Sequence, residues 1–236
     1  MRLYMIMISS RQKQAGISSH QIKISRCGAT GISFEIVEQL GWQCPDFVAV
    51  SVGDGCIITG VWKGFRDMYA VGLIDRLPRL LSVQAEGCCP INRAFAGNAP
   101  IVWMSEYTLA DSIAVGIPRN ADKALAAIKE SNGICINVSD DEILAVMRLL
   151  GKHAGVFGEP AGVAGTAGLV KAVQHSMIPR DALVVSIVTG NGLKDIASAQ
   201  KAAGMESRQN GNKNGASHLI CIEPDMELLE KELGNP

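Results

Sequence analysis

The turn over residues 53–56, with glycine at positions 53 and 55, has the residue types that bind anions in proteins. It stands between an apolar run, residues 47–52, and a segment, residues 57–71, whose apolar residues recur at helical spacing. Glycines let backbone amides approach an anion closely, and the start of a helix adds N–H groups and partial positive charge. The turn therefore predicts a phosphate site. On spacing alone, a purely structural turn explains these glycines equally well.

A dinucleotide-binding turn is a second functional interpretation of the same glycines. Gly53, Gly55 and Gly60 follow a predicted strand, and Glu86 ends the next strand. Four residues separate Gly55 from Gly60 where the dinucleotide fingerprint has two, and Glu86 is far downstream for an acid that binds a ribose. The match to this class of site is weak.

The composition is that of an apolar globular chain. Its 236 residues are 47% hydrophobic and 19% charged, which suffices for one large domain or two small ones. A formal net charge of −1 without a basic stripe argues against a nucleic-acid partner. Seven cysteines without paired spacing indicate reduced thiols and no metal site. No apolar stretch is long enough to span a membrane, so we expect a cytoplasmic protein.

Strands and helices alternate along most of the chain. Residues 1–31 are polar and Ser-rich and predict an irregular N-terminus. Strands are predicted over residues 47–52, 79–85, 134–138 and 183–188, and helices over 32–40, 57–71, 122–131, 139–150 and 161–175. Residues 204–217 predict a flexible insertion, followed over residues 218–236 by a strand and a helix of the same domain.

This alternation predicts an α/β fold with an open, mostly parallel sheet and flanking helices. Ligands of such sheets bind at the carboxyl ends of the strands. The turn over residues 53–56 and a second Gly-rich turn, residues 189–192, both follow predicted strands and fall at that edge. Ser139 and Glu142 have the spacing of a capping box, which makes this acid a helix-cap partner rather than a catalyst.

Six segments in order resemble the threonine synthase family, which belongs to the fold-type-II, tryptophan-synthase-β-like pyridoxal-phosphate enzymes. They are ISFEIVEQL (32–40), VGDG through KGF (52–65), VQAEG (83–87), ADSI (110–113), EPAG (159–162) and TGNGLKD (189–195). The resemblance implies that residues 32–199 form the larger part of the family's α/β domain. It also implies pyridoxal 5′-phosphate as cofactor and a lyase of threonine biosynthesis.

The resemblance also implies roles for individual residues. The loop that holds the cofactor phosphate through its amides would consist of Gly53, Asp54, Gly55, Cys56 and Ile57. Asp54 stands where Asn is common in the family, and a carboxylate beside a phosphate weakens binding unless it points away.

Two further cofactor-binding residues follow from the resemblance. Thr189 is similar to the residue whose hydroxyl faces the pyridine nitrogen, and Glu159 lies in a loop near the cofactor ring. Without the resemblance, Thr189 is a strand-end cap and Glu159 an exposed acid. Lys63 and Lys194 belong to family motifs, and we interpret both as structural.

The chain shows no counterpart of the Schiff-base lysine that the family's chemistry requires. Relatives carry this lysine in a Ser-x-Lys-x-Arg type motif well upstream of the phosphate loop, and only 52 residues precede Gly53 here. Lys13 and Lys23 are the candidates, and neither has such neighbours. We therefore expect no catalytic residue in this chain, which resembles the carboxyl-terminal half to two-thirds of a threonine synthase. A misassigned start or a split gene would explain this.

Several functions remain open from the sequence. The first is a threonine synthase-like lyase, whose complete members convert O-phosphohomoserine to threonine and phosphate; this chain alone would be inactive. The second is a non-catalytic module that binds pyridoxal phosphate or another phosphorylated metabolite, and the third is a gene remnant. Within the family, a serine or threonine dehydratase and a cysteate-forming synthase also remain. The expected partners are an amino-acid substrate and either a second copy in a homodimer or a missing N-terminal half.

Overall fold

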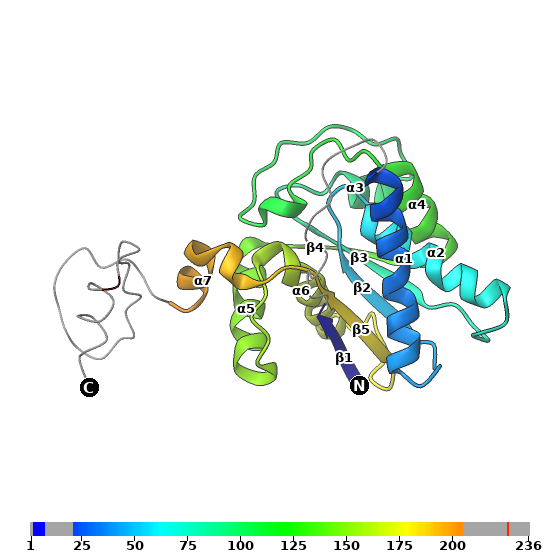
Figure 1. The fold of residues 1–236 in the computed structure, drawn as a ribbon. Helices are drawn as coiled ribbons and strands as arrows, with labels where there is room; N and C mark the ends of the chain where they lie inside the picture. The colour runs from blue at the N-terminus through cyan, green and yellow to red at the C-terminus, as the bar shows by residue number, and fades with distance from the viewer. Residues whose placement is uncertain (1, 8–20, 205–225, 227–236) are drawn as a thin grey trace, which may run out of the picture.

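A single parallel sheet forms the centre of the computed structural model, which describes residues 2–7, 21–204 and 226 (Figure 1). Within these residues five strands lie in the order β1-β5-β2-β3-β4, and every neighbouring pair is parallel. The strands are β1 (Arg2–Met7), β2 (Phe47–Ser51), β3 (Arg79–Ala85), β4 (Ile134–Val138) and β5 (Leu183–Val188). The predicted α/β fold with an open parallel sheet is confirmed.

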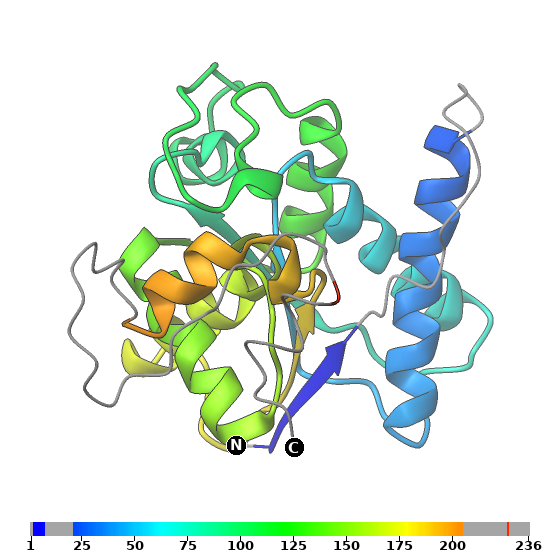
Figure 2. The same cartoon turned by 60° about the vertical axis from the view of Figure 1, so that its left-hand side comes forward.

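Helices cover both faces of this sheet (Figures 1 and 2). One face carries α1 (Gln21–Gln39), α2 (Cys56–Ala70), α3 (Pro90–Gly97) and α4 (Ala121–Glu130), and the other carries α5 (Asp140–Ala154), α6 (Pro160–Gln174) and α7 (Ile196–Ala202). Two short 3-10 turns, η1 (Asp111–Ile113) and η2 (Gly192–Lys194), belong to connecting loops. None of the described helices has the length and apolarity to cross a membrane.

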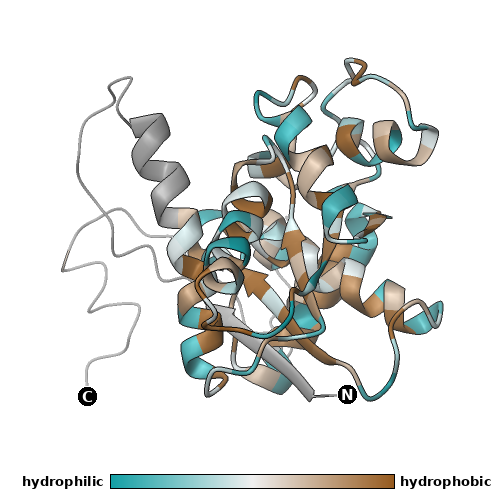
Figure 3. Ribbon diagram, turned by 90° about the vertical axis from the view of Figure 1, so that its right-hand side faces the viewer, coloured by the Kyte–Doolittle hydropathy of each residue, from teal (hydrophilic) through white to brown (hydrophobic). Residues whose placement is uncertain are grey.

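The central strands are buried on both faces, which explains their nearly continuous apolar sequences. In β2, Val48 and Val50 belong to the core beneath α1, α2 and α4, whereas Phe47 and Ala49 belong to the core beneath α5 and α6. Figure 3 shows the resulting concentration of hydrophobic residues in the sheet and on the inner sides of the helices. The small residues of α6 let it lie close to the sheet, since a Cβ at Gly168 would collide with the side chain of Val83.

The connections between strands change direction between β2 and β5. From β2 the chain crosses one face through α2 to reach β3, and it returns over the other face through α6 to reach β5 on the opposite side of β2. Such a reversal is a topological switch point, where open α/β sheets bind ligands at the carboxyl ends of their strands. The predicted turns over residues 53–56 and 189–192 follow the two strands that flank this point.

The N-terminal region differs from its predicted irregular character. β1 pairs with β5 from Arg2 opposite Leu183 to Met7 opposite Val188, and α1 begins at Gln21 rather than at residue 32. A strand at the edge of a sheet owes its conformation to a distant partner, which local composition does not reveal. Residues 205–217 of the predicted insertion, and the predicted final strand and helix apart from Met226, lie outside the described residues. The domain boundaries stay a prediction.

Candidate functional site

The turn after β2 owes both of its glycines to close contacts and backbone geometry. Gly55 has a φ of +84°, in the left-handed region, and a Cβ there would lie 2.7 Å from the Cβ of Ala124. A Cβ at Gly53 would lie 2.9 Å from the Cα of Ile113, in η1. Larger residues would therefore displace η1 or α4, and the structural interpretation of these glycines holds alongside any role in binding.

The carbonyl groups of this turn are held by neighbouring segments. Gln84, on β3, donates its side-chain amide to the Val52 carbonyl at 3.2 Å. Asn120, before α4, donates its backbone N–H to the Asp54 carbonyl at 3.1 Å and its side-chain amide to the Gly55 carbonyl at 3.1 Å. Because the C=O and N–H of a trans peptide point in opposite directions, these bonds fix where the amides point.

The amides of the turn point away from those holding groups. The Gly53 N–H is directed to the β5 side, since Gln84 holds the preceding carbonyl on the β3 side. Within the described part of the chain, neither the Gly53 N–H nor the Gly55 N–H has a protein acceptor, although both glycines are buried. The N–H of Ile57 belongs to the first turn of α2, which no side chain caps. Buried amides are almost always paired, so this arrangement fits a small anion.

The side chain of Asp54 is engaged by Arg119. The Arg119 backbone N–H donates to Oδ1 at 3.1 Å, Nε donates to Oδ2 at 3.1 Å, and Nη2 also donates to Oδ2. Hydrogen bonds from the guanidinium hold the pKa of the Asp54 carboxyl below its ordinary value, against the opposing effect of burial. The carboxylate is therefore charged and paired, and only the backbone of Asp54 faces the other side of the turn.

The turn after β5 encloses a buried carboxylate. Glu159 precedes α6, and its side chain is only 7% exposed, so it is not the exposed acid that the sequence alone suggests. Its Oε2 lies 3.0 Å from the Nζ of Lys194, and its N–H donates to the Gly190 carbonyl at 3.0 Å. The hydrogen bond with Glu159 raises the pKa of the Lys194 amine. Thr189, half-buried, follows directly after β5.

Lys194 and η1 connect the two turns. The Nζ of Lys194 also donates to the hydroxyl of Ser112, and it lies 3.9 Å from Oδ1 of Asp111. Since η1 packs on Gly53, the predicted residues of the two turns belong to one contiguous site. Lys63 lies elsewhere, paired with Asp67 on the outer side of α2, where it lines a surface groove of about 1050 Å³.

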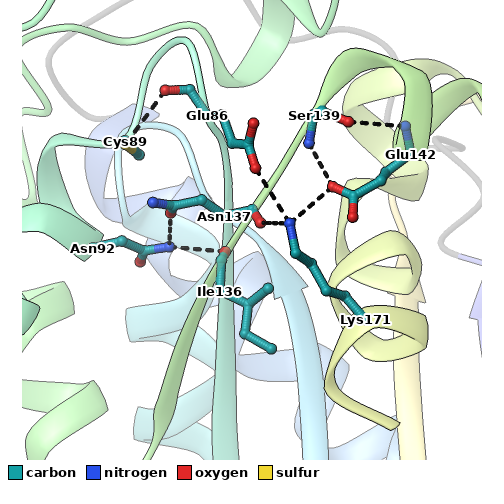
Figure 4. A network of polar contacts seen from close by, with 8 residues as sticks. All are labelled: Glu86, Cys89, Asn92, Ile136, Asn137, Ser139, Glu142 and Lys171. Carbon is teal, nitrogen blue, oxygen red and sulfur yellow. Dashed lines mark hydrogen bonds and ion pairs between the residues drawn. The ribbon is translucent and has the colours of Figure 1, made fainter. Parts of the chain in front are cut away.

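A separate polar network lies at the carboxyl ends of β3 and β4 (Figure 4). Lys171, from α6, contacts Glu86 at 3.2 Å, Glu142 at 3.0 Å and the Asn137 carbonyl at 2.9 Å. The predicted capping box of Ser139 and Glu142 is confirmed. Burial alone would raise the pKa of the Glu142 carboxyl, but hydrogen bonds from Ser139 and Lys171 outweigh it and lower the pKa.

Sequence reasoning missed the residues that hold the turn after β2. Gln84, Arg119 and Asn120 belong to none of the predicted site residues, and no spacing in the sequence connects them to it. Among the described residues no group of His, Cys, Asp and Glu could hold a metal ion. Among the cysteines whose side chains the structure describes, none forms a disulfide: Cys44, Cys56, Cys88, Cys89 and Cys135.

Comparison with known proteins supports one family. The profile of the family described as "Pyridoxal-phosphate dependent enzyme" matches residues 14–190. The chain is 43% identical over 208 residues to the threonine synthase of Methanocaldococcus jannaschii, covering 87% of this chain and 48% of that protein. It is 42% identical over 207 residues to that of Synechocystis sp., covering 88% and 49%. The chain thus spans about half the length of these relatives, and the resemblance to the threonine synthase family is confirmed.

Solved structures with the same fold have more distant sequences. The processed form of threonine deaminase isoform 2 from Solanum lycopersicum has a TM-score of 0.62 at 21% identity, covering 76% of this chain and 49% of its own. A fungal L-serine ammonia-lyase from Rhizomucor miehei has a TM-score of 0.61 at 18% identity, covering 70% and 51%. At these identities the likeness shows the fold alone.

Proposed function

Because the chain belongs to the family of pyridoxal-phosphate dependent enzymes, we propose that it is the cofactor-phosphate-binding part of a threonine synthase-like lyase. The reaction of the complete enzyme would convert O-phosphohomoserine to threonine and phosphate. The observation that carries the proposal is the pair of buried amides at Gly53 and Gly55, which have no acceptor among the described residues and lie at the switch point of the sheet.

The residues of the turn fit the phosphate group of pyridoxal phosphate. The N–H groups of Gly53, Gly55, Cys56 and Ile57 would donate to its oxygens, and the positive end of α2 would favour its charge. When bound, pyridoxal phosphate supplies an electron sink for negative charge at the α-carbon of an amino acid. The protein contributes position and electrostatics.

The turn after β5 would hold the opposite end of the cofactor. In this proposal the hydroxyl of Thr189 provides a neutral partner for the pyridine nitrogen. Glu159 would keep the turn in place through its ion pair with Lys194 and its hydrogen bond to Gly190.

We propose that this chain alone does not turn over substrate, because the lysines of its family motifs, Lys63 and Lys194, do not suit the role of a nucleophilic amine. Lys194 is paired with Glu159, and its raised pKa is opposite to what such an amine needs. Lys63 is paired with Asp67 on the outer surface. Lys13 and the side chain of Lys23 lie outside the described part of the structure.

The test combines cofactor binding with covalent labelling. Purified chain is mixed with pyridoxal phosphate, reduced with borohydride and analysed by mass spectrometry, and non-covalent binding is measured with and without inorganic phosphate. We expect phosphate-competitive binding without a specifically labelled lysine, and no release of phosphate from O-phosphohomoserine. Release of phosphate by the chain alone would contradict the proposed inactivity, and absence of any binding would contradict the proposed site.

A non-catalytic binding module is the second candidate, and the same unpaired amides favour it. Co-expression with the portion of the Methanocaldococcus jannaschii threonine synthase that lies outside the match separates the two, because this chain covers only 48% of that protein. Formation of threonine from O-phosphohomoserine by the co-expressed pair supports the lyase. Binding of pyridoxal phosphate without any such activity supports the module. Parallel assays with serine and threonine test the dehydratase alternative.

A further inference from the structure

Asp54 puts a negative charge into the turn that the proposed function assigns to phosphate binding. Like charges this close oppose one another, so an ionised carboxylate at this position would weaken the binding of a phosphate. Hydrogen bonds from Arg119 lower the pKa of the Asp54 carboxyl, which favours its ionised form at neutral pH. Any phosphate site built from this turn therefore needs a means of cancelling that charge.

Arg119 supplies the cancelling charge in a fixed geometry. Its guanidinium donates through Nε to Oδ1 at 3.3 Å and through Nη2 to Oδ2, the side-on arrangement that matches a carboxylate with two parallel bonds. Its backbone N–H donates to the same carboxylate at 3.1 Å. The carboxylate is thus held by the main chain as well as by the side chain, which limits its freedom to turn.

The direction of the carboxylate follows from the next residue. Asn120 holds the carbonyls of Asp54 and Gly55, so the segment formed by Arg119 and Asn120 lies on the carbonyl side of the turn. The amides of the same peptides point to the opposite side. Ala124 packs against Gly55 on the carbonyl side and closes it. The charge of Asp54 is consequently kept on the side away from the amides.

We propose that Arg119 is a positioning residue for phosphate binding, which acts by neutralising Asp54 and holding its carboxylate away from the amides of the turn. It acts through Asp54 and is not itself a ligand of the phosphate. This inference rests on the proposed function of the turn. It explains how an aspartate is compatible with a phosphate site.

A set of four variants of the full chain tests the inference. Arg119→Ala, Asp54→Asn and the double variant are compared with Arg66→Ala, a matched control. Arg66 is also an exposed arginine paired with one carboxylate, Glu130 at 3.0 Å, but it lies in the outer groove. Binding of inorganic phosphate, pyridoxal phosphate and pyridoxal is measured by calorimetry, and folding is monitored by thermal unfolding.

The variants have distinct expected results. Arg119→Ala weakens binding of both phosphate ligands about tenfold, since Asp54 is left unpaired beside them, and leaves pyridoxal unaffected. The phosphate affinity of the double variant returns to within about twofold of that of the chain without substitutions, because the variant lacks the carboxylate charge that Arg119 cancels. Asp54→Asn alone strengthens phosphate binding about threefold, because the arginine is retained. Arg66→Ala leaves all three affinities unchanged.

Four outcomes overturn the inference. A double variant as weak as Arg119→Ala would make Arg119 a direct ligand, and equal affinities for Arg119→Ala and Arg66→Ala would remove its role. If Arg119→Ala does not fold, the Asp54→Asn variant decides: phosphate binding that is unchanged or weaker in this variant contradicts the inference. If the chain without substitutions binds neither phosphate nor pyridoxal phosphate, the proposed function fails together with the inference. The other outcomes leave phosphate binding by that chain intact, so they contradict only the role of Arg119.

Discussion

The carboxyl edge of the sheet carries two polar regions of opposite character. At the ends of β3 and β4, Lys171 joins Glu86, Glu142 and the Asn137 carbonyl, and the positive and negative groups satisfy one another (Figure 4). At the end of β2, neighbouring segments hold the carbonyls of the turn while its buried amides stay unpaired among the described residues. A network in which every polar group is paired stabilises the fold, whereas buried N–H donors without acceptors indicate a site for a ligand.

The largest effect is expected where the turn after β2 is broken. Gly55→Ala introduces a Cβ 2.7 Å from Ala124 at a residue with a φ of +84°, so we expect a loss of about 3 kcal/mol of unfolding free energy. Phosphate binding should be abolished with it. Chemical denaturation and calorimetry measure both quantities.

Gly72→Ala is the control for backbone strain. Gly72 has a φ of +75°, and a Cβ there would meet no atom within 4 Å, so the cost should be only about 1 kcal/mol with phosphate binding intact. Equal losses for the two variants would show that the contact with Ala124 has no effect on the turn.

A loss of intermediate size is expected in the closed network. Lys171→Met leaves Glu86 and Glu142 without their cation, and because Lys171 is partly buried we expect about 1–2 kcal/mol of destabilisation. Phosphate affinity should not change, because the network is separate from the turn after β2. A parallel loss of phosphate affinity in calorimetry would contradict the division of the edge into two regions.

The two regions also differ in how far the sequence predicts them. The strands at 79–85 and 183–188 match their predicted bounds, because burial on both faces gives largely apolar runs that end at glycine turns. The edge strand at 134–138 also matches, since Gly133 precedes it and the cap of α5 follows it. The capping box is equally local, with both members inside one helical turn. Such features need no knowledge of distant segments.

The missed features depend on long-range contacts. β1 has a strand conformation because it pairs with β5, at the other end of the described chain. Arg119 reaches Asp54 across 65 residues, and Gln84 reaches Val52 across 32. The turn after β2 was therefore predictable from its glycines, but the residues that orient its amides were not.

A smaller effect is expected at the predicted cap of α5. Ser139→Ala removes the hydroxyl that accepts the Glu142 N–H at 3.2 Å, which should cost about 1 kcal/mol. Ser139→Asp restores an N-cap acceptor and should recover most of that stability. Thermal unfolding measures both variants. No recovery with Asp would assign the loss to something other than capping.

The smallest predicted effect is the loss of folding stability at low pH, which we compare between Asp54 and Glu142, one from each region. The folded pKa of Asp54 lies below its unfolded value, so its pairing with Arg119 contributes stability that is fully present above about pH 5 and is lost as the pH falls through the folded pKa. Asp54→Asn should therefore lose less stability than the unchanged chain below about pH 4. Glu142→Gln should behave in the same way, since the pKa of Glu142 is also lowered. Only Asp54→Asn should at the same time alter phosphate affinity at neutral pH, because Asp54, unlike Glu142, lies in the turn proposed to bind phosphate. Urea denaturation between pH 3 and 7, followed by calorimetry at pH 7, separates a charge that only stabilises the fold from one that also affects the proposed ligand.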